Sequence, residues 1–377
     1  MRLVYCIHST YNPGGMERVL LNKVRYLVGK GGYEISIVTT DQKGRPSFFP
    51  FPSEVKMTDL GINYTDDKFK DPFTKIIGYF RRKRLHKKRL TAYLKEVRAD
   101  IVISLYPCES SFIPSIKDGS KKILEFHQCK LVRLCYGRKG IIGLTDKIRT
   151  RMDERMVRRF DRFVVLTEED KGYWGDLPNI LVIPNAALAI PEKKTTLSAK
   201  RVIAVGRLDH QKAFDRLIKA WSLISPASRP GWRLDIFGQG EWEEMLKNMI
   251  TDLGLSDSVS VNRPTQCVFD EYSASAFLAM TSHYEGFPMV MIEAMACGLP
   301  VVTFDYPCGP KDIITEGVDG LIIKDGDLQA FANAMTSLMN DKTLLESMSA
   351  QAPKVVERYS EEKVMEKWEN CFRSILS

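Results

Sequence analysis

Residues 282–302 read S-H-Y-E-G-F-P-M-V-M-I-E-A-M-A-C-G-L-P-V-V, a polar loop that leads into an apolar run. The run at 290–296 predicts a buried helix, and residues 300–304 predict a strand. Glu285 lies in the loop and Glu293 lies inside the helix. The two carboxylates would share one helix face if the helix began early enough. Each carboxylate can accept hydrogen bonds from two hydroxyl groups. The N–H groups at the helix start can bind an anion.

The same alternation of strand and helix extends through the second half of the chain. Alternation of this kind indicates a parallel sheet covered by helices. The predicted strands are residues 202–206, 233–237, 259–261, 277–280, 300–304 and 321–323, and the predicted helices include residues 214–225, 240–253 and 290–296.

The first half of the chain has a similar pattern. Residues 3–8, 35–39, 101–105, 122–126 and 163–166 are predicted strands, and residues 16–30 are a predicted helix that Gly31 ends. The two halves share little sequence, which indicates a doubled α/β fold. The predicted organisation is an N-terminal domain at 1–188, a linker at 189–200, a second domain at 201–358 and a C-terminal helical segment at 359–377.

Length and composition restrict the class of protein. The chain has 377 residues, which is too long for one ordinary core, and 27% of them are charged, as in soluble globular proteins. No apolar run approaches the roughly 20 residues that span a bilayer, and the N-terminus lacks signal-peptide features. A cytoplasmic location is therefore expected. The eight cysteines form no C-x-x-C pair, so we expect reduced, mostly buried thiols.

Positive charge is concentrated in the first half. Residues 1–180 contain 35 Lys and Arg against 21 Asp and Glu, a net +14, whereas the rest of the chain is −6. Seven of the nine residues at 81–89 are basic, and this basic segment indicates either an anionic membrane surface or a solvated helix face. No basic–aromatic interleaving supports a nucleic-acid partner. The seven residues are Arg81, Arg82, Lys83, Arg84, Lys87, Lys88 and Arg89.

Two other loops follow predicted strands. Gly14 and Gly15 stand between the first strand and the first helix, where the backbone can approach an anion; an ordinary tight turn is the alternative. Arg207 and Lys212 follow the strand at 202–206, and two cations beyond a strand end can converge on one diphosphate. A solvated loop with incidental charges is the alternative interpretation there.

The run at 282–302 resembles the signature of glycosyltransferase family 4, whose members have the GT-B fold. The G-R-L-x-x-x-K element at 206–212, the early G-G loop and residues 183–185 stand at matching places, as does C-G-P-K-D-I-I-T-E-G-V-D-G-L at 308–321. The resemblance covers nearly the whole chain. It implies two Rossmann-like domains that face each other across a deep cleft, with the C-terminal helix returning towards the N-terminal domain.

The resemblance also implies roles in donor binding. Arg207 and Lys212 would neutralise the donor diphosphate as the sugar leaves. Glu293 would hold the nucleotide ribose. Glu285 would hold the donor sugar, together with the backbone of Gly286, Phe287 and Pro288.

On the N-terminal side, Gly14 and Gly15 would border the diphosphate and the acceptor. His127 matches a histidine that the family places beside the donor sugar; its alternative is a core histidine bonded to a backbone carbonyl. The family works without a bound metal, and no Asp-x-Asp metal site is apparent. Two positions depart from the family pattern, because Ala213 and Ala186 stand where glycine is usual.

The expected activity is therefore a retaining, metal-independent transfer of a hexose or N-acetylhexosamine from a UDP-sugar to a lipid-linked glycan in bacterial capsule, exopolysaccharide or lipopolysaccharide synthesis. No cofactor is expected beyond the nucleotide-sugar, and the protein would sit peripherally at the inner face of the cell membrane. The alternatives are a GDP-sugar donor or a soluble acceptor. From other classes, they are a non-catalytic sugar-nucleotide-binding protein and a basic nucleic-acid-binding protein.

Overall fold

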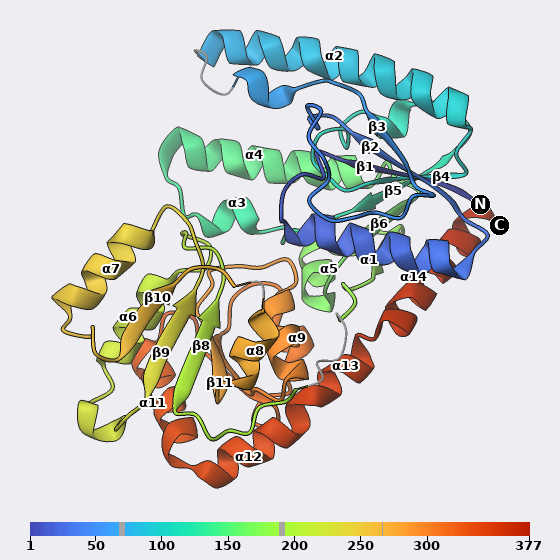
Figure 1. The fold of residues 1–377 in the computed structure, drawn as a ribbon. Coiled ribbons are helices and arrows are strands. Elements are labelled where there is room, and N and C mark those ends of the chain that lie inside the picture. Colours follow the sequence, from blue (N-terminus) through green and yellow to red (C-terminus); the bar gives the residue numbers. More distant parts are fainter. Residues whose placement is uncertain (68–71, 188–192, 266) are drawn as a thin grey trace.

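A computed structural model describes residues 1–67, 72–187, 193–265 and 267–377 and contains two parallel β-sheets with helices on their faces (Figure 1). This two-sheet α/β architecture confirms the expected fold class. Among the described residues, no helix has the length and apolar character needed to cross a membrane.

The first sheet has seven strands in the order β3-β2-β1-β4-β5-β6-β7. The central strand β1 pairs in parallel with β2 and β4, so that Tyr5 stands between Ile37 and Ile103. These strands are apolar on both faces because helices cover both sides of a parallel sheet. The strands are β1 (Arg2–Ile7), β2 (Glu34–Thr39), β3 (Lys56–Asp59), β4 (Ile101–Ser104), β5 (Lys121–Glu125), β6 (Arg162–Val165) and β7 (Ile180–Val182).

The second sheet has six strands in the order β10-β9-β8-β11-β12-β13, all parallel. The strand order reverses direction between β8 and β11, and ligands of open α/β sheets bind beyond the strand ends at such a point. The strands are β8 (Arg201–Val205), β9 (Arg233–Phe237), β10 (Val259–Asn262), β11 (Phe277–Met280), β12 (Val301–Phe304) and β13 (Gly320–Ile323).

Helices follow most strands. The described α-helices are α1 (Gly15–Lys30), α2 (Pro72–Val97), α3 (Val132–Cys135), α4 (Gly140–Val157), α5 (Glu168–Trp174), α6 (Phe214–Ser222), α7 (Glu243–Asp252), α8 (Val268–Ser273), α9 (Met289–Ala296), α10 (Pro310–Ile313), α11 (Leu328–Asn340), α12 (Lys342–Gln351), α13 (Val355–Arg358) and α14 (Glu361–Leu376). Short 3₁₀ turns lie at Tyr64–Asp67, Ile113–Ser115, Pro226–Ser228 and Ala352–Lys354.

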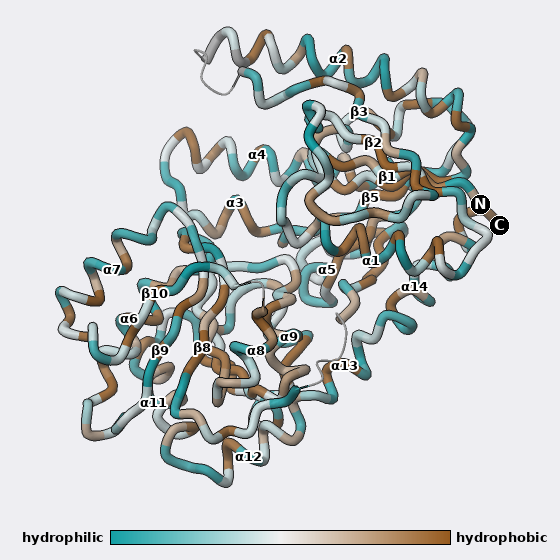
Figure 2. The backbone as a smooth tube through the Cα atoms, in the orientation of Figure 1, coloured by the Kyte–Doolittle hydropathy of each residue, from teal (hydrophilic) through white to brown (hydrophobic). Residues whose placement is uncertain are grey.

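The last helix returns to the first half of the chain. Trp368 and Phe372 of α14 are buried in the same apolar cluster as Leu3 and Val24, although they follow the second sheet in sequence. Figure 1 shows α14 ending beside the N-terminus, and Figure 2 shows apolar residues concentrated on the strands of both sheets. The helix therefore ties the two halves together, as expected.

Several elements differ from the sequence prediction. The short strands β3 and β7 were not predicted; β3 is a partly exposed edge strand without an apolar pattern. α7 begins at Glu243, later than the predicted residue 240. Gly240 instead belongs to the preceding loop and packs on Leu208, whose carbonyl oxygen would lie 2.3 Å from a Cβ there. The start of the predicted linker at 189–200 lies outside the described residues, and residues 193–200 contain no helix or strand.

Candidate active site

A cleft between the two halves is lined by loops at the carboxyl ends of parallel strands. The loops after β1 and β5 supply the glycine pair and His127 from the first sheet. The loops after β8 and β11 supply the basic pair and the Glu285 loop from the second. The described lining includes the following predicted site residues: Gly14, Gly15, His127, Arg207, Lys212, Glu285, Gly286 and Phe287.

Lys212 and Glu285 form an ion pair inside this cleft. The Lys212 ammonium lies 2.6 Å from Glu285 Oε1, and both side chains are largely buried. Ser282 Oγ donates to Glu285 at 2.8 Å, and Gln211 Nε2 donates to Glu285 at 3.2 Å. The expected roles were diphosphate binding for Lys212 and sugar binding for Glu285. The structure adds that the two side chains are paired, so that each fixes the position of the other.

Arg207 remains the more exposed cation of the pair. Its side chain is 67% exposed and lies 3.2 Å from Asp209. Its Nη2 donates to Gln211 Oε1 at 2.7 Å. Gln211, which local sequence did not single out, therefore links Arg207 to Glu285, whereas Lys212 binds Glu285 directly.

The condition for Glu285 and Glu293 to share one helix face, an early start of the helix, is not met. α9 begins at Met289, so Glu285 precedes the helix and only Glu293 lies within it. Pro288, with φ −76° and ψ 87°, is the non-helical residue that immediately precedes the helix. The two carboxylates accordingly face different groups of the site.

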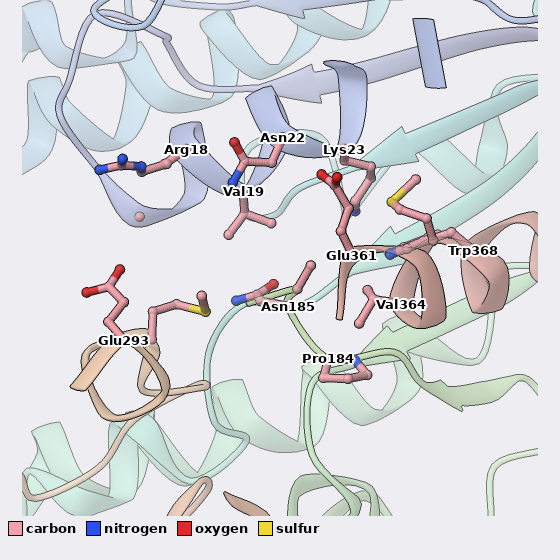
Figure 3. A pocket seen from close by; sticks show the side chains of 14 residues that line it. Arg18, Val19, Asn22, Lys23, Pro184, Asn185, Glu293, Glu361, Val364 and Trp368 are labelled. Carbon is pink, nitrogen blue, oxygen red and sulfur yellow. The ribbon is translucent and has the colours of Figure 1, made fainter. Parts of the chain in front are cut away.

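Glu293 projects into a pocket that adjoins the cleft (Figure 3). Arg18 of α1 lies opposite, so the pocket is shared between the two halves. Tyr272 donates its hydroxyl to Glu293 at 3.5 Å. Burial raises the pKa of Glu293, although Arg18 and Tyr272 act in the opposite direction. A carboxylate placed in this way can accept hydroxyl hydrogen bonds from a ligand.

The ring of His127 lies against a buried carboxylate, although its Nε2 makes no hydrogen bond of good geometry to the described residues. Its Nε2 lies 3.1 Å from Glu125 Oε1. The Lys23 ammonium lies 2.6 and 2.7 Å from the two Glu125 oxygens and 3.7 Å from the centre of the Trp368 ring. Burial alone would raise the pKa of Glu125, but Lys23 and His127 outweigh it and lower the pKa to about 2. Glu125 is therefore an anion beside the His127 ring.

The loops of the two halves touch at Gly286. A Cβ at this position would lie 2.1 Å from the carbonyl oxygen of His127, so no larger residue fits without a shift. Ala213, where the family has glycine, has φ +48°, a left-handed conformation that favours glycine. The backbone at Ala213 thus keeps the conformation that glycine would adopt, although the family's glycine is replaced.

At the start of α1, Gly14 is the N-cap residue and no side chain caps the helix from that position. The Glu17 carboxylate folds back towards Gly14, and Oε2 lies 2.1 Å from where a Gly14 Cβ would be. Burial raises the pKa of Glu17. The predicted anion position at Gly14 and Gly15 is thus bordered by an acidic side chain that local sequence did not reveal.

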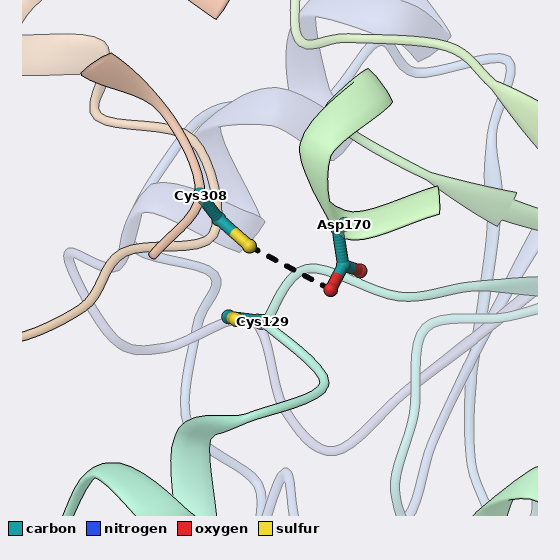
Figure 4. A group of neighbouring side chains, drawn as sticks. All are labelled: Cys129, Asp170 and Cys308. Carbon is teal, nitrogen blue, oxygen red and sulfur yellow. Dashed lines mark hydrogen bonds between the residues drawn. The ribbon is translucent and has the colours of Figure 1, made fainter. Parts of the chain in front are cut away.

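Cys129, Asp170 and Cys308 meet at the boundary between the halves (Figure 4). Cys308 Sγ donates to Asp170 Oδ1 at 3.6 Å, and the Cys308 N–H donates to Glu169 at 2.9 Å. Burial raises the pKa of Asp170 to about 6. All eight cysteines are free, and five are buried, as expected. Spacing could not predict this cluster, because its members are far apart in sequence.

Two facing α/β sheets with a charged cleft between them define a GT-B-type glycosyltransferase. Residues 13–187 match the model of Glycosyltransferase Family 4, and residues 189–355 match that of Glycosyl transferases group 1. The chain belongs to this family of glycosyltransferases and is an enzyme of that class.

Relatives and solved structures agree. An uncharacterized glycosyltransferase of Haemophilus influenzae is 30% identical over 97% of this chain and 98% of its own. An α-1,4-N-acetyl-D-galactosaminyltransferase of Campylobacter jejuni, named for an undecaprenol-linked substrate, is 25% identical over 98% and 97%. HepE of Anabaena, solved with UDP-glucose, has a TM-score of 0.74, 17% identity and coverage of 99% and 100%. The chain spans only 24% of a 35% identical exopolysaccharide phosphotransferase of Streptomyces coelicolor.

Proposed function

We propose that this glycosyltransferase transfers a hexose or N-acetylhexosamine from a UDP-sugar to a lipid-linked glycan, with retention of anomeric configuration, during synthesis of a bacterial capsule, exopolysaccharide or lipopolysaccharide. The observation that carries the proposal is the convergence of Arg207, Lys212, Glu285 and His127 in one interdomain cleft. The undecaprenol-linked substrate in the name of the Campylobacter enzyme supports the lipid-linked acceptor, and the UDP-glucose complex of Anabaena HepE supports the UDP-sugar.

The geometry supports a division of labour in the reaction. When the donor diphosphate departs, its growing negative charge would lie beside Arg207 and the Lys212 ammonium, which stabilise it in the transition state. Glu285, already fixed by Lys212 and Ser282, would accept hydroxyl hydrogen bonds from the sugar. His127, beside Glu125, would contact the sugar from the opposite domain.

Retention is tested on the product. With an α-linked UDP-sugar donor, the one-bond coupling constant at the new anomeric carbon should show an α-glycoside by NMR. A β-glycoside would contradict the retaining assignment and leave the transferase class intact. Assays with GDP-sugars and with soluble acceptors address the two alternatives within the same class.

Replacement of Glu293 by alanine should weaken binding of free UDP by about 10-fold or more, because the ribose would lose a buried hydrogen-bond partner. The measurement is isothermal titration with UDP. Glu361→Ala is the matched control, since Glu361 lines the same pocket from α14. Equal loss in both variants would assign ribose binding to the pocket in general and not to Glu293.

Turnover should persist in excess EDTA. Side-chain cations already stand where the diphosphate would lie, so we propose that no divalent metal is required for charge neutralisation. The initial rate with and without EDTA is the measurement. Complete loss of activity that Mg²⁺ or Mn²⁺ restores would show that the role of Arg207 and Lys212 is misassigned.

A peripheral location at the inner face of the membrane is part of the proposal, and no nucleic-acid partner is proposed. Three cations of the basic segment have partners within the fold. Arg89 donates to the carbonyls of Leu60 and Gly61, and Arg82 lies 3.9 Å from Asp66. Lys83 lies over the Tyr79 ring. The exposed cations of this segment are Arg81, Arg84, Lys87, Lys88 and Arg89, and of these Arg89 is held by the two carbonyls.

A further inference from the structure

Exposed apolar side chains are concentrated on two helices of the N-terminal half. Among the described residues, eighteen large apolar side chains are exposed, and nine of them lie on α2 and α4. Soluble proteins rarely gather exposed apolar groups in this way, and such patches mark interaction sites. The nine are Ile76, Ile77, Tyr79, Phe80, Ile141, Ile142, Leu144, Ile148 and Met152.

The helix α4 has the reverse of the usual amphipathic arrangement. Its buried residues are Asp146, Thr150 and Val157, so it packs on the protein through a largely polar face. Ile141, Leu144, Ile148 and Met152 recur at spacings of three and four and therefore form one stripe. The stripe lies on the opposite face, and Ile141 is 82% exposed. A helix that displays its apolar stripe to the outside lacks the partner that would cover it.

The apolar stripe is displayed on a fixed support. The Arg138 guanidinium binds Asp146 at 2.9 and 3.1 Å and clamps the preceding loop onto the helix. A Cβ on Gly143 would lie 2.1 Å from the Arg138 carbonyl oxygen, so glycine allows this close turn. These contacts fix the first turns of α4, so the apolar stripe belongs to an ordered helix and not to a frayed helix end.

Positive charge flanks the apolar stripe. Lys147 and Arg151 lie on one side of it and Arg149 on the other, and all three are exposed. Tyr79 of α2 lies within electrostatic reach of Arg149. Figure 1 shows the first turns of α2 and α4 at the same end of the N-terminal half. An apolar stripe between cations fits an anionic bilayer, whose phosphates pair with the cations while the acyl region receives the stripe.

The stripe begins beside the cleft. Tyr136, just before α4, accepts a hydrogen bond from the Tyr284 hydroxyl at 2.8 Å and stacks on His210 with ring centres 5.2 Å apart. Tyr284 is the residue that precedes Glu285. A surface bound by α4 would therefore lie at the entrance of the candidate active site.

We propose that α4 is a membrane-inserting helix, and that its stripe of Ile141, Leu144, Ile148 and Met152 enters an anionic bilayer at the mouth of the cleft. The attachment then depends on apolar insertion by α4, and the basic segment of α2 adds long-range attraction. This surface rests on its own observations; only the presentation of a lipid-linked acceptor to the cleft rests on the proposed function.

The test is co-sedimentation with vesicles of phosphatidylcholine containing phosphatidylglycerol, at low and at physiological salt. Wild-type protein should bind in both conditions. Ile141→Ser, Leu144→Ser and Ile148→Ser combined should reduce the partition coefficient by about 10-fold or more, because three apolar groups no longer insert. The matched control combines Leu223→Ser, Leu253→Ser and Val318→Ser, which are also exposed but lie in the C-terminal half, and it should bind like wild type.

Unchanged stabilisation by UDP would show that each variant is folded with an intact cleft. Wild-type-like sedimentation of the α4 variant would overturn the proposal. So would loss of binding only when Arg81, Arg84, Lys87 and Lys88 are replaced by serine, since the basic segment would then carry the attachment. A wild-type dimer that the α4 variant dissociates in lipid-free sedimentation velocity would also overturn it, because the stripe would then be covered by a second copy.

Discussion

Lys212→Ala is expected to lower kcat by about 100-fold or more, the size of effect seen when one preorganised charge is removed from a transition state. The change removes the cation from the diphosphate position. It also leaves the largely buried Glu285 without its 2.6 Å partner. Arg207→Ala should produce a loss of the same order, but through the diphosphate alone, because Arg207 does not contact Glu285 in this structure.

Steady-state kinetics with saturating donor measure this effect. Lys219→Ala is the control, since Lys219 pairs with Asp215 on the surface of α6, where a single exposed pair contributes little. Wild-type kcat in either active-site variant would refute the assignment of the cationic pair. A loss confined to KM would instead place the residue in ground-state binding.

The second large effect is on stability. Lys23→Met should lower the free energy of unfolding by about 3–5 kcal/mol, because it leaves the buried Glu125 carboxylate without its counterion. Both side chains are at most 5% exposed, so water cannot replace the lost partner. Urea denaturation gives the measurement. The double variant Lys23→Met with Glu125→Leu should recover much of the loss, since an apolar pair removes the unpaired charge.

The ion pair between Lys23 and Glu125 should also make stability depend on pH. The pKa of Glu125, about 2 in the folded state, lies below the ordinary carboxyl value of roughly 4.3. Ionised Glu125 therefore contributes its full stabilisation when the pH is above the ordinary carboxyl pKa. This stabilisation is lost as the pH falls towards 2. The double variant should show a shallower acid destabilisation than wild type. An equally steep decline in both would mean that other carboxylates dominate.

Periodicity predicted much of the fold, because buried parallel strands are continuous apolar runs. The edge strand β3 escaped prediction because its side chains are partly exposed and, among the described strands, it pairs with β2 alone. The helix α4 was missed for the opposite reason. Its apolar residues have helical spacing, but they face outwards, so the usual link between apolar periodicity and a core does not hold.

Sequence motifs predicted the members of the candidate site better than their contacts. Local order placed Glu285 and Glu293 near the start of one helix, but the actual start at Met289 separates their environments. The partners of Glu285 and Glu125, which are Lys212 and Lys23, come from distant segments, and only the tertiary fold brings them together. No local spacing rule reports such pairs.

The central claim is that the cleft binds a uridine-diphosphate sugar without a metal. Thermal unfolding in EDTA with UDP-, GDP- and ADP-sugars tests it most directly, since a ligand of the folded state raises stability by RT ln(1 + [L]/Kd). We expect a clear rise in Tm with a UDP-sugar and little rise with a GDP- or ADP-sugar. In Glu293→Ala the rise with the UDP-sugar should be smaller. The same Tm with every nucleotide, or a rise only with GDP- or ADP-sugars, would contradict it.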